Sequence, residues 1–108
     1  MALAELLAQH VSAFETEKKM MFGAPCYFVQ GNMFTGVFSE VLFARFSTQD
    51  RGQIDERHLG SVFEPVEGRK MMEYRTLSKK VLDDPKALDE WLERSYSYVS
   101  TLKPKKKA

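Results

Sequence analysis

The sequence predicts an α+β domain whose centre is an antiparallel sheet. Apolar residues recur every three or four positions near both ends of the chain, which is the spacing of one helix face. Between these stretches stand short apolar runs separated by turn residues, which is typical of strands. The length of 108 residues fits a single domain with one core.

Composition narrows the class of protein. With 44% hydrophobic and 29% charged residues and a net charge of +1, the chain is typical of a globular protein. Its one cysteine excludes a disulfide framework and multi-cysteine metal motifs. No apolar run approaches the ~20 residues of a membrane span, and no basic region precedes the apolar N-terminus. We therefore expect a cytoplasmic protein with no membrane partner.

The first predicted element is a helix. Its apolar stripe consists of Leu3, Leu6, Leu7, His10, Val11 and Phe14. The charged stretch that follows, from Glu15 to Lys19, is expected to leave the core.

A three-stranded antiparallel meander is predicted from Cys26 to Phe46. Pro25 stands near its start, where a missing N–H group is tolerated. Gly31-Asn32 is predicted as the first hairpin turn, because both residues accept a positive φ. The dipeptide Ser39-Glu40 is predicted as the second turn.

A second helix is predicted to follow the meander. Ser47 is its expected N-cap, with Asp50 in the first turn, and the helix is expected to run to about His58 and to stop at Gly60. Two further strands are then predicted around the turn Glu67-Gly68, over Val62–Pro65 and Met71–Leu77. Pro65 places the first of them at a sheet edge.

The last helix is predicted from Asp84 to Leu102. Asp84 is the expected cap and Pro85 the first helical residue. The buried stripe of this helix is predicted to be Leu88, Trp91, Leu92, Ser95, Val99 and Leu102. The element order is therefore α-β-β-β-α-β-β-α. We expect the folded domain to span residues 1–102 and a flexible lysine-rich tail to span 103–108.

An ordered set of short motifs carries a family resemblance. The motifs are Met21-Phe22-Gly23, Cys26-Tyr27-Phe28-Val29, Gly31-Asn32-Met33-Phe34, Leu42-Phe43-Ala44-Arg45, Phe63-Glu64-Pro65, Gly68-Arg69, Glu73-Tyr74, Asp84-Pro85 and Trp91-Leu92. Together they resemble the TfoX N-terminal domain family, the N-terminal half of the Sxy/TfoX competence regulators, over nearly the whole chain. The resemblance implies one antiparallel sheet with flanking helices, similar to the secretion-chaperone-like and YjbR-like folds. It also implies a non-catalytic role in transcription, since the full-length regulators act with the cyclic-AMP receptor protein.

The meander is predicted to be apolar on both faces. With Gln30 paired to Met33, one face carries Cys26, Phe28, Gln30, Met33, Thr35, Val37, Leu42, Ala44 and Phe46, and the other carries Tyr27, Val29, Phe34, Gly36, Phe38, Val41, Phe43 and Arg45. Either helices cover both faces, or the sheet curls around one helix, or one face is exposed for association. In the last case Tyr27, Phe34 and Phe43 are the candidate contacts of a homodimer.

A basic cluster on the last hairpin is the other candidate contact site. We expect Arg69, Lys70 and Arg75 to be exposed there, with Tyr74 beside them, and to bind a protein partner. A nucleic-acid accessory role using Gly68–Lys80 and the C-terminal lysines is an alternative, although acidic residues are interspersed. A small-ligand-binding domain is a third.

No residue set predicts catalysis, a metal or a cofactor. Cys26 lies in an apolar run without a neighbouring base, so a buried, inert thiol is expected. His10 and His58 are isolated from carboxylates at ligand spacing. The leading hypothesis is a protein-interaction module that binds a transcription regulator or itself.

Overall fold

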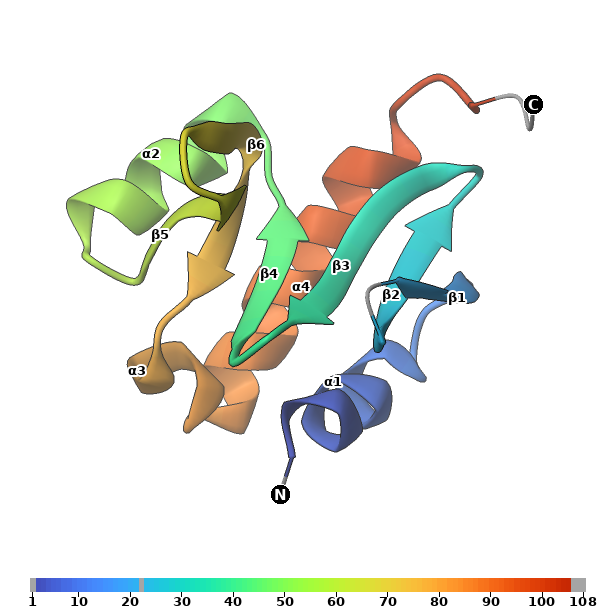
Figure 1. Ribbon diagram of the computed structural model, residues 1–108, viewed down its shortest axis with the longest axis horizontal. Coiled ribbons are helices and arrows are strands. Elements are labelled where there is room, and N and C mark those ends of the chain that lie inside the picture. The colour runs from blue at the N-terminus through green and yellow to red at the C-terminus, as the bar shows by residue number, and fades with distance from the viewer. Residues whose placement is uncertain (1, 22, 106–108) are drawn as a thin grey trace.

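A computed structural model describes residues 2–21 and 23–105 (Figure 1). Six antiparallel strands form one sheet in the order β1-β2-β3-β4-β6-β5. The strands are β1 (Glu17–Met21), β2 (Ala24–Val29), β3 (Asn32–Phe38), β4 (Val41–Arg45), β5 (Gly60–Val66) and β6 (Arg69–Leu77). The helices are α1 (Leu3–Val11), α2 (Thr48–Glu56), α3 (Lys79–Leu82) and α4 (Pro85–Ser100). The predicted α+β fold with one antiparallel sheet and flanking helices is confirmed.

The meander has four strands rather than the three predicted, because the charged stretch after α1 forms the edge strand β1. This strand pairs with β2, and the ammonium group of Lys19 lies 4.9 Å from the centre of the Phe28 ring. Lysines are common on edge strands, where their charge discourages pairing with another chain. The absence of an apolar alternation hid this strand from the sequence analysis.

The first hairpin turn is Gln30-Gly31, one residue earlier than predicted. Both residues have positive φ, 51° and 84°, and Val29 pairs with Asn32. A bulge follows: Phe28 pairs with Met33 but Tyr27 pairs with Thr35, which leaves Phe34 as an extra residue. The predicted pairing of Gln30 with Met33 is therefore wrong.

The bulge reverses the alternation of side chains along β3. As a result each predicted face mixes residues that the structure places on opposite sides of the sheet. One side carries Tyr27, Val29, Phe34, Val37, Leu42, Ala44 and Phe46, and the other carries Cys26, Phe28, Met33, Phe38, Val41 and Phe43.

The helices supply the core on the first of these two sides, the covered face. In Figure 1, α4 runs behind β3 and β4. The predicted stripe of α4 is confirmed as buried at Leu88, Trp91, Leu92, Ser95 and Val99. The helix ends at Ser100, so Leu102, predicted as its last buried residue, lies past the helix and is half-buried. Asp84 caps this helix by accepting hydrogen bonds from the N–H groups of Lys86 and Ala87 at 3.1 and 3.3 Å, with Pro85 in the first turn, as predicted.

The second helix starts as predicted and ends slightly earlier. The Ser47 hydroxyl accepts from the Asp50 N–H at 3.2 Å, but α2 ends at Glu56 and His58 takes a positive φ of 56°. Gly60 is the first residue of β5 rather than a helix stop. A Cβ there would collide with the carbonyl oxygen of Thr76, so the close approach of β6 requires glycine. The short helix α3 was not predicted.

The last hairpin and the C-terminal segment complete the sheet. The turn Glu67-Gly68 and the edge position of β5, which contains Pro65, are confirmed. Residues 103–105 of the predicted flexible tail lie against the β2–β3 hairpin: the Lys105 N–H donates to the Gln30 carbonyl at 2.9 Å. Residues 106–108 lie outside the described residues, as does Phe22 of the Met-Phe-Gly motif. Within residues 2–21 and 23–105, no helix is both long and apolar enough to cross a membrane.

Candidate contact surface on the open sheet face

The side of the sheet opposite the helices, the open face, carries its own apolar cluster. The buried members are Cys26, Phe43, Phe63 and Tyr74, and the partly buried members are Met21, Phe28, Met33, Phe38, Val41 and Met71. All ten belong to strands, whereas the covered face draws its core from every helix. Among the described residues, then, no helix contributes to this second cluster.

Aromatic rings form the floor of the open face. The rings of Phe43 and Phe63 stack with their centres 4.2 Å apart and their planes 7° from parallel. Tyr74 meets Phe43 edge-on at 6.0 Å, and its hydroxyl donates to the carbonyl of Met33 at 3.3 Å. Burial is the largest cause of the raised pKa of Tyr74, so this phenol stays neutral.

Gly36 keeps this floor low. A Cβ at position 36 would lie 2.6 Å from the Cys26 sulfur and 2.9 Å from the Phe43 ring. The predicted register places this glycine between Tyr27 and Phe43. The structure instead places it between Cys26 and Phe43, because the bulge shifts β3 by one residue.

Two adjoining hollows lie above the floor. One has a volume of about 400 Å³ and the other about 290 Å³, and Met21, Met33 and Met71 line both of them. We call the two together the open-face trough. All six strands contribute to its walls, through Met21, Cys26, Met33, Phe43, Phe63 and Met71. Methionine side chains are flexible and polarisable, so such a surface adapts to different apolar partners.

Among the described residues, the charged residues that line the trough are all basic. Arg69 lines the larger hollow, and Arg45 and Lys105 line the smaller one. Arg45 already donates from Nε to Glu73 at 3.0 Å and lies over the Tyr74 ring. This hydrogen bond is the main reason that the pKa of Glu73 is lowered. The exposed guanidinium of Arg69, by contrast, has no ion pair or side-chain hydrogen bond within residues 2–21 and 23–105.

The TfoX N-terminal domain matches residues 5–99, which is nearly the whole chain. The chain belongs to the TfoX N-terminal domain family. That family is linked to competence regulation and is a regulatory domain not known as catalytic. Among curated proteins, none matches the chain.

The basic cluster predicted on this TfoX N-terminal domain is dispersed by the fold. Arg75 was expected to be exposed, but it is only 6% exposed. Side chains alternate along β6, and the Arg75 side chain lies on the covered side. There its guanidinium donates to both carboxylate oxygens of Asp55 at 2.8 and 2.9 Å. Hydrogen bonding to Arg75 is the largest cause of the lowered pKa of Asp55. Lys70 is exposed but lies between Arg69 and Met71, which both line the trough, so alternation directs it away.

The three predicted self-association residues are divided between the two faces. Tyr27 and Phe34 lie beneath the helices, and Phe34 packs against the rings of Phe14 and Tyr96 at 5.7 and 5.4 Å. Neither is available to a second copy. Phe43 does lie on the open face, although neighbouring rings leave it 2% exposed. Tyr74, predicted as a partner contact, lines the smaller hollow.

The thiol of Cys26 lines the larger hollow. The predicted burial is confirmed, at 4% exposure, and burial raises the pKa of the thiol. No carboxylate stands at ligand spacing from either histidine in the sequence, but in the structure His10 Nδ1 contacts the carboxylate of Asp89. Within the described part of the chain, no three His, Cys, Asp or Glu side chains cluster in a way that could hold a metal ion.

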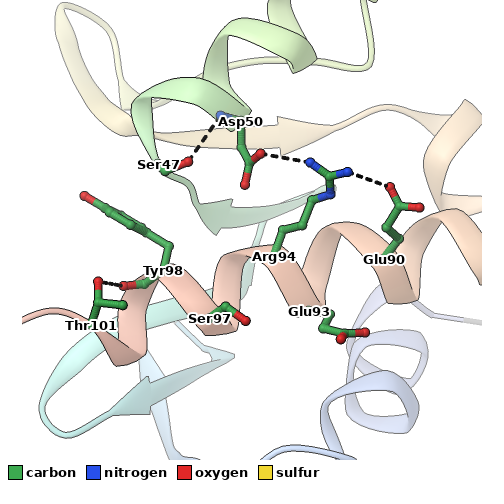
Figure 2. A pocket seen from close by; sticks show the side chains of 8 residues that line it. All are labelled: Ser47, Asp50, Glu90, Glu93, Arg94, Ser97, Tyr98 and Thr101. Atoms are coloured by element: carbon green, nitrogen blue, oxygen red, sulfur yellow. Dashed lines mark hydrogen bonds and ion pairs between the residues drawn. The ribbon is translucent and has the colours of Figure 1, made fainter.

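A polar groove between α2 and α4 has a volume of about 560 Å³ (Figure 2). Arg94 crosses it and donates to Asp50 at 3.1 Å, and its second terminal nitrogen lies 3.3 Å from Glu90. Ser47 and Asp50 form the cap of α2, and the Thr101 hydroxyl donates to the Tyr98 carbonyl. Because these polar groups bond one another, we assign the groove to the packing of α2 on α4.

The methionines and Phe63 were not predicted as site residues. Apolar residues in strands usually signal core, and the two faces of this meander have similar composition. The only signal was that both faces are apolar while the helices are few. That observation gave an exposed face as one of three alternatives, but the shifted register put the wrong residues on it.

Proposed function

We propose that this TfoX N-terminal domain is a non-catalytic protein-interaction module that acts in the cytoplasm as an accessory in competence-type transcriptional regulation. The open-face trough is its contact surface. The observation that carries the proposal is the apolar cluster contributed by all six strands, to which no helix within the described residues adds. Contiguous apolar surface of this kind is typical of association sites.

A face fits this role better than the sheet edges do. The edge strand β1 carries Lys18 and Lys19, and the edge strand β5 carries Pro65, which has no N–H group to donate. Lysine and proline on edge strands hinder strand addition. Partner binding through backbone pairing is thus disfavoured at both edges, which leaves the trough.

Small-ligand binding is a second candidate. The larger hollow, at about 400 Å³, is within the range of small-molecule sites, and its walls are almost entirely apolar. The nucleic-acid alternative has less support, because Arg69, Lys70 and Arg75 do not share one surface. A homodimer through the trough remains a proposal whose test is the oligomeric state.

Adjacent methionines provide the test of the proposed function. Met71 lines the trough, while its neighbour Met72 is 58% exposed and lines neither hollow. Met71→Glu and Met72→Glu, each introduced into the chromosome of the source organism, add the same charge at successive positions. The measurement is the set of transcripts that change when the gene is deleted.

We expect Met71→Glu to reproduce the transcript changes of the deletion and Met72→Glu to leave the transcripts unchanged. Equal amounts of both variants in the cell, and unchanged circular dichroism of both purified proteins, control for misfolding. Wild-type transcripts with Met71→Glu at normal abundance would contradict the proposed contact surface.

A further inference from the structure

We infer that the open-face trough binds an apolar protein segment flanked by carboxylates, and that Arg69 and Lys105 pair with those carboxylates. This inference rests on the proposed function and names the chemistry of the partner.

Charge at the rim is the first argument. Arg45, Arg69 and Lys105 line the trough, and no carboxylate within residues 2–21 and 23–105 lines either hollow. Two nearby carboxylates on β5 and β6 are already bonded: Glu73 accepts from Arg45, and Glu64 accepts from the N–H of Gly68 at 2.6 Å. Within residues 2–21 and 23–105, Arg69 and Lys105 have no ion pair, so the rim keeps two unpaired cations. Opposite charges at an interface select partners and accelerate their encounter.

The position of Lys105 is fixed by the backbone, which is the second argument. The Lys105 N–H donates to the Gln30 carbonyl at 2.9 Å, and the Asn32 side chain donates to the Lys103 carbonyl at 3.0 Å. A Cβ on Gly31 would lie 2.5 Å from the carbonyl oxygen of Lys105, so the segment can lie this close only beside glycine. The fold thus holds the backbone of Lys105 at the smaller hollow, while Arg69 lines the larger one.

The shape of the trough is the third argument. Its two hollows share three methionines, so it is a continuous apolar surface rather than a single closed cavity. A peptide segment with successive apolar side chains can occupy both hollows at once, as in other recognition surfaces that bind an amphipathic segment in a groove. Methionines allow the walls to adapt to the side chains that enter.

A second copy of the chain fits this surface less well. A two-fold contact places the same patch against itself. The cations at the rim of one trough would then approach those of the other, and the part of the chain that the structure describes supplies no lining carboxylate to pair with them. Like charges across an interface disfavour association. An acidic partner segment meets the same apolar surface without this repulsion.

The test is a selection from a random-peptide library against the intact protein. We expect the enriched peptides to combine apolar residues with an excess of Asp and Glu. Their binding should be lost with Met71→Glu. It should weaken by roughly tenfold with Arg69→Glu, as expected when an attractive rim charge becomes repulsive. Lys70→Glu is the matched control, because it makes the same charge change one residue along β6 and should leave the affinity unchanged.

The outcomes separate the inference from the proposed function. Enriched peptides that are basic or neutral, or that lose equal affinity with Arg69→Glu and Lys70→Glu, would overturn the acidic partner while retaining the trough as a contact surface. If no peptide is enriched, or if the enriched peptides bind the Met71→Glu variant as tightly as the wild type, both the inference and the proposed function fail. Binding of the protein to itself that Met71→Glu abolishes, in place of peptide binding, would assign the trough to a homodimer.

Discussion

The two faces of this sheet are similarly apolar but are built differently. The covered face is filled with side chains that are fully buried beneath helices, such as Phe34, Leu42 and Leu92. On the open face, six of the ten clustered residues are only partly buried, among them Met21, Met33 and Met71. The covered face therefore supplies the stability of the fold, and the open face supplies a surface that can change its packing when a partner binds.

Arginines show the same contrast between the faces. Arg75, on the covered side, is buried and pairs with Asp55 through two hydrogen bonds. Arg69, at the open face, is exposed and pairs with no side chain among the described residues. An unpaired cation beside an apolar surface contributes little to folding but can contribute to binding. The burial of the side chains and the pairing of the arginines thus both assign stability to the covered face and partner binding to the open face.

The largest expected effect compares one residue from each face. Leu92→Ala removes a fully buried side chain and should lower the free energy of unfolding by about 2–5 kcal/mol. Met71→Ala, at the partly exposed trough, should lower it by less than about 1 kcal/mol, because water already reaches the site. Chemical denaturation measures both. Equal losses would mean that the open face is as much a part of the core as the covered one.

The next effect tests the floor of the trough. Gly36→Ala places a methyl group against Cys26 and Phe43, and overpacking of this kind should cost about 1–3 kcal/mol. Gly52→Ala in α2 is the matched control: nothing lies within 4 Å of its Cβ position, and alanine should stabilise this helix by up to about 1 kcal/mol. The midpoint of thermal unfolding should therefore fall for Gly36→Ala and rise for Gly52→Ala. A higher midpoint for Gly36→Ala would show that the floor has room for a methyl group.

A smaller effect is the pH dependence of the free energy of unfolding, which should involve Arg75 but not Arg69. The folded-state pKa of Asp55 is lowered, chiefly by hydrogen bonding to Arg75, so its contribution to stability is present above the ordinary aspartate pKa of about 4 and is lost as the pH falls through the folded value. Asp55→Asn should make the acid side of the stability curve shallower. Arg69→Met should leave the slope unchanged. If Arg69→Met flattened the curve as well, Arg69 would have a folding partner.

The smallest effect concerns the rate of thiol modification. Burial raises the pKa of Cys26, so its reaction with an alkylating reagent should be slower than that of a free thiol and should accelerate at higher pH than a free thiol does. Because Cys26 lines the trough, the reaction should proceed in the native state and ignore low concentrations of denaturant. Val99→Cys in a Cys26→Ser background, on the covered face, should react only as fast as the protein opens. If the alkylation rates of the two thiols rose similarly with denaturant concentration, Cys26 would not be accessible in the native state.

Local signals in the sequence predicted much of the fold. The caps Ser47 and Asp84, the turn Glu67-Gly68 and the buried stripe of α4 depend on neighbouring residues, and all are confirmed. The bulge at Phe34 depends on how two strands pair, and no residue type announces it. A one-residue shift exchanges the faces of a strand, so it placed Tyr27 and Phe34 at the site and omitted Met33. The pairing of Arg75 with Asp55 is equally non-local, since the two residues are twenty positions apart and strand β5 lies between them.

The most direct test of the central claim uses methionines from both sides of the site. Met21, Met33 and Met71 line the trough, whereas Met20 and Met72 are 63% and 58% exposed and line neither hollow. NMR of protein labelled at the methionine methyl groups, recorded in buffer and in a clarified extract of the source organism, observes both groups at once. We predict that the signals of the three trough methionines broaden in the extract, that those of Met20 and Met72 stay sharp, and that protease treatment of the extract reverses the broadening. Broadening of Met20 and Met72 to the same degree, unchanged trough signals, or broadening that survives protease treatment would contradict a protein-contact surface on the open face.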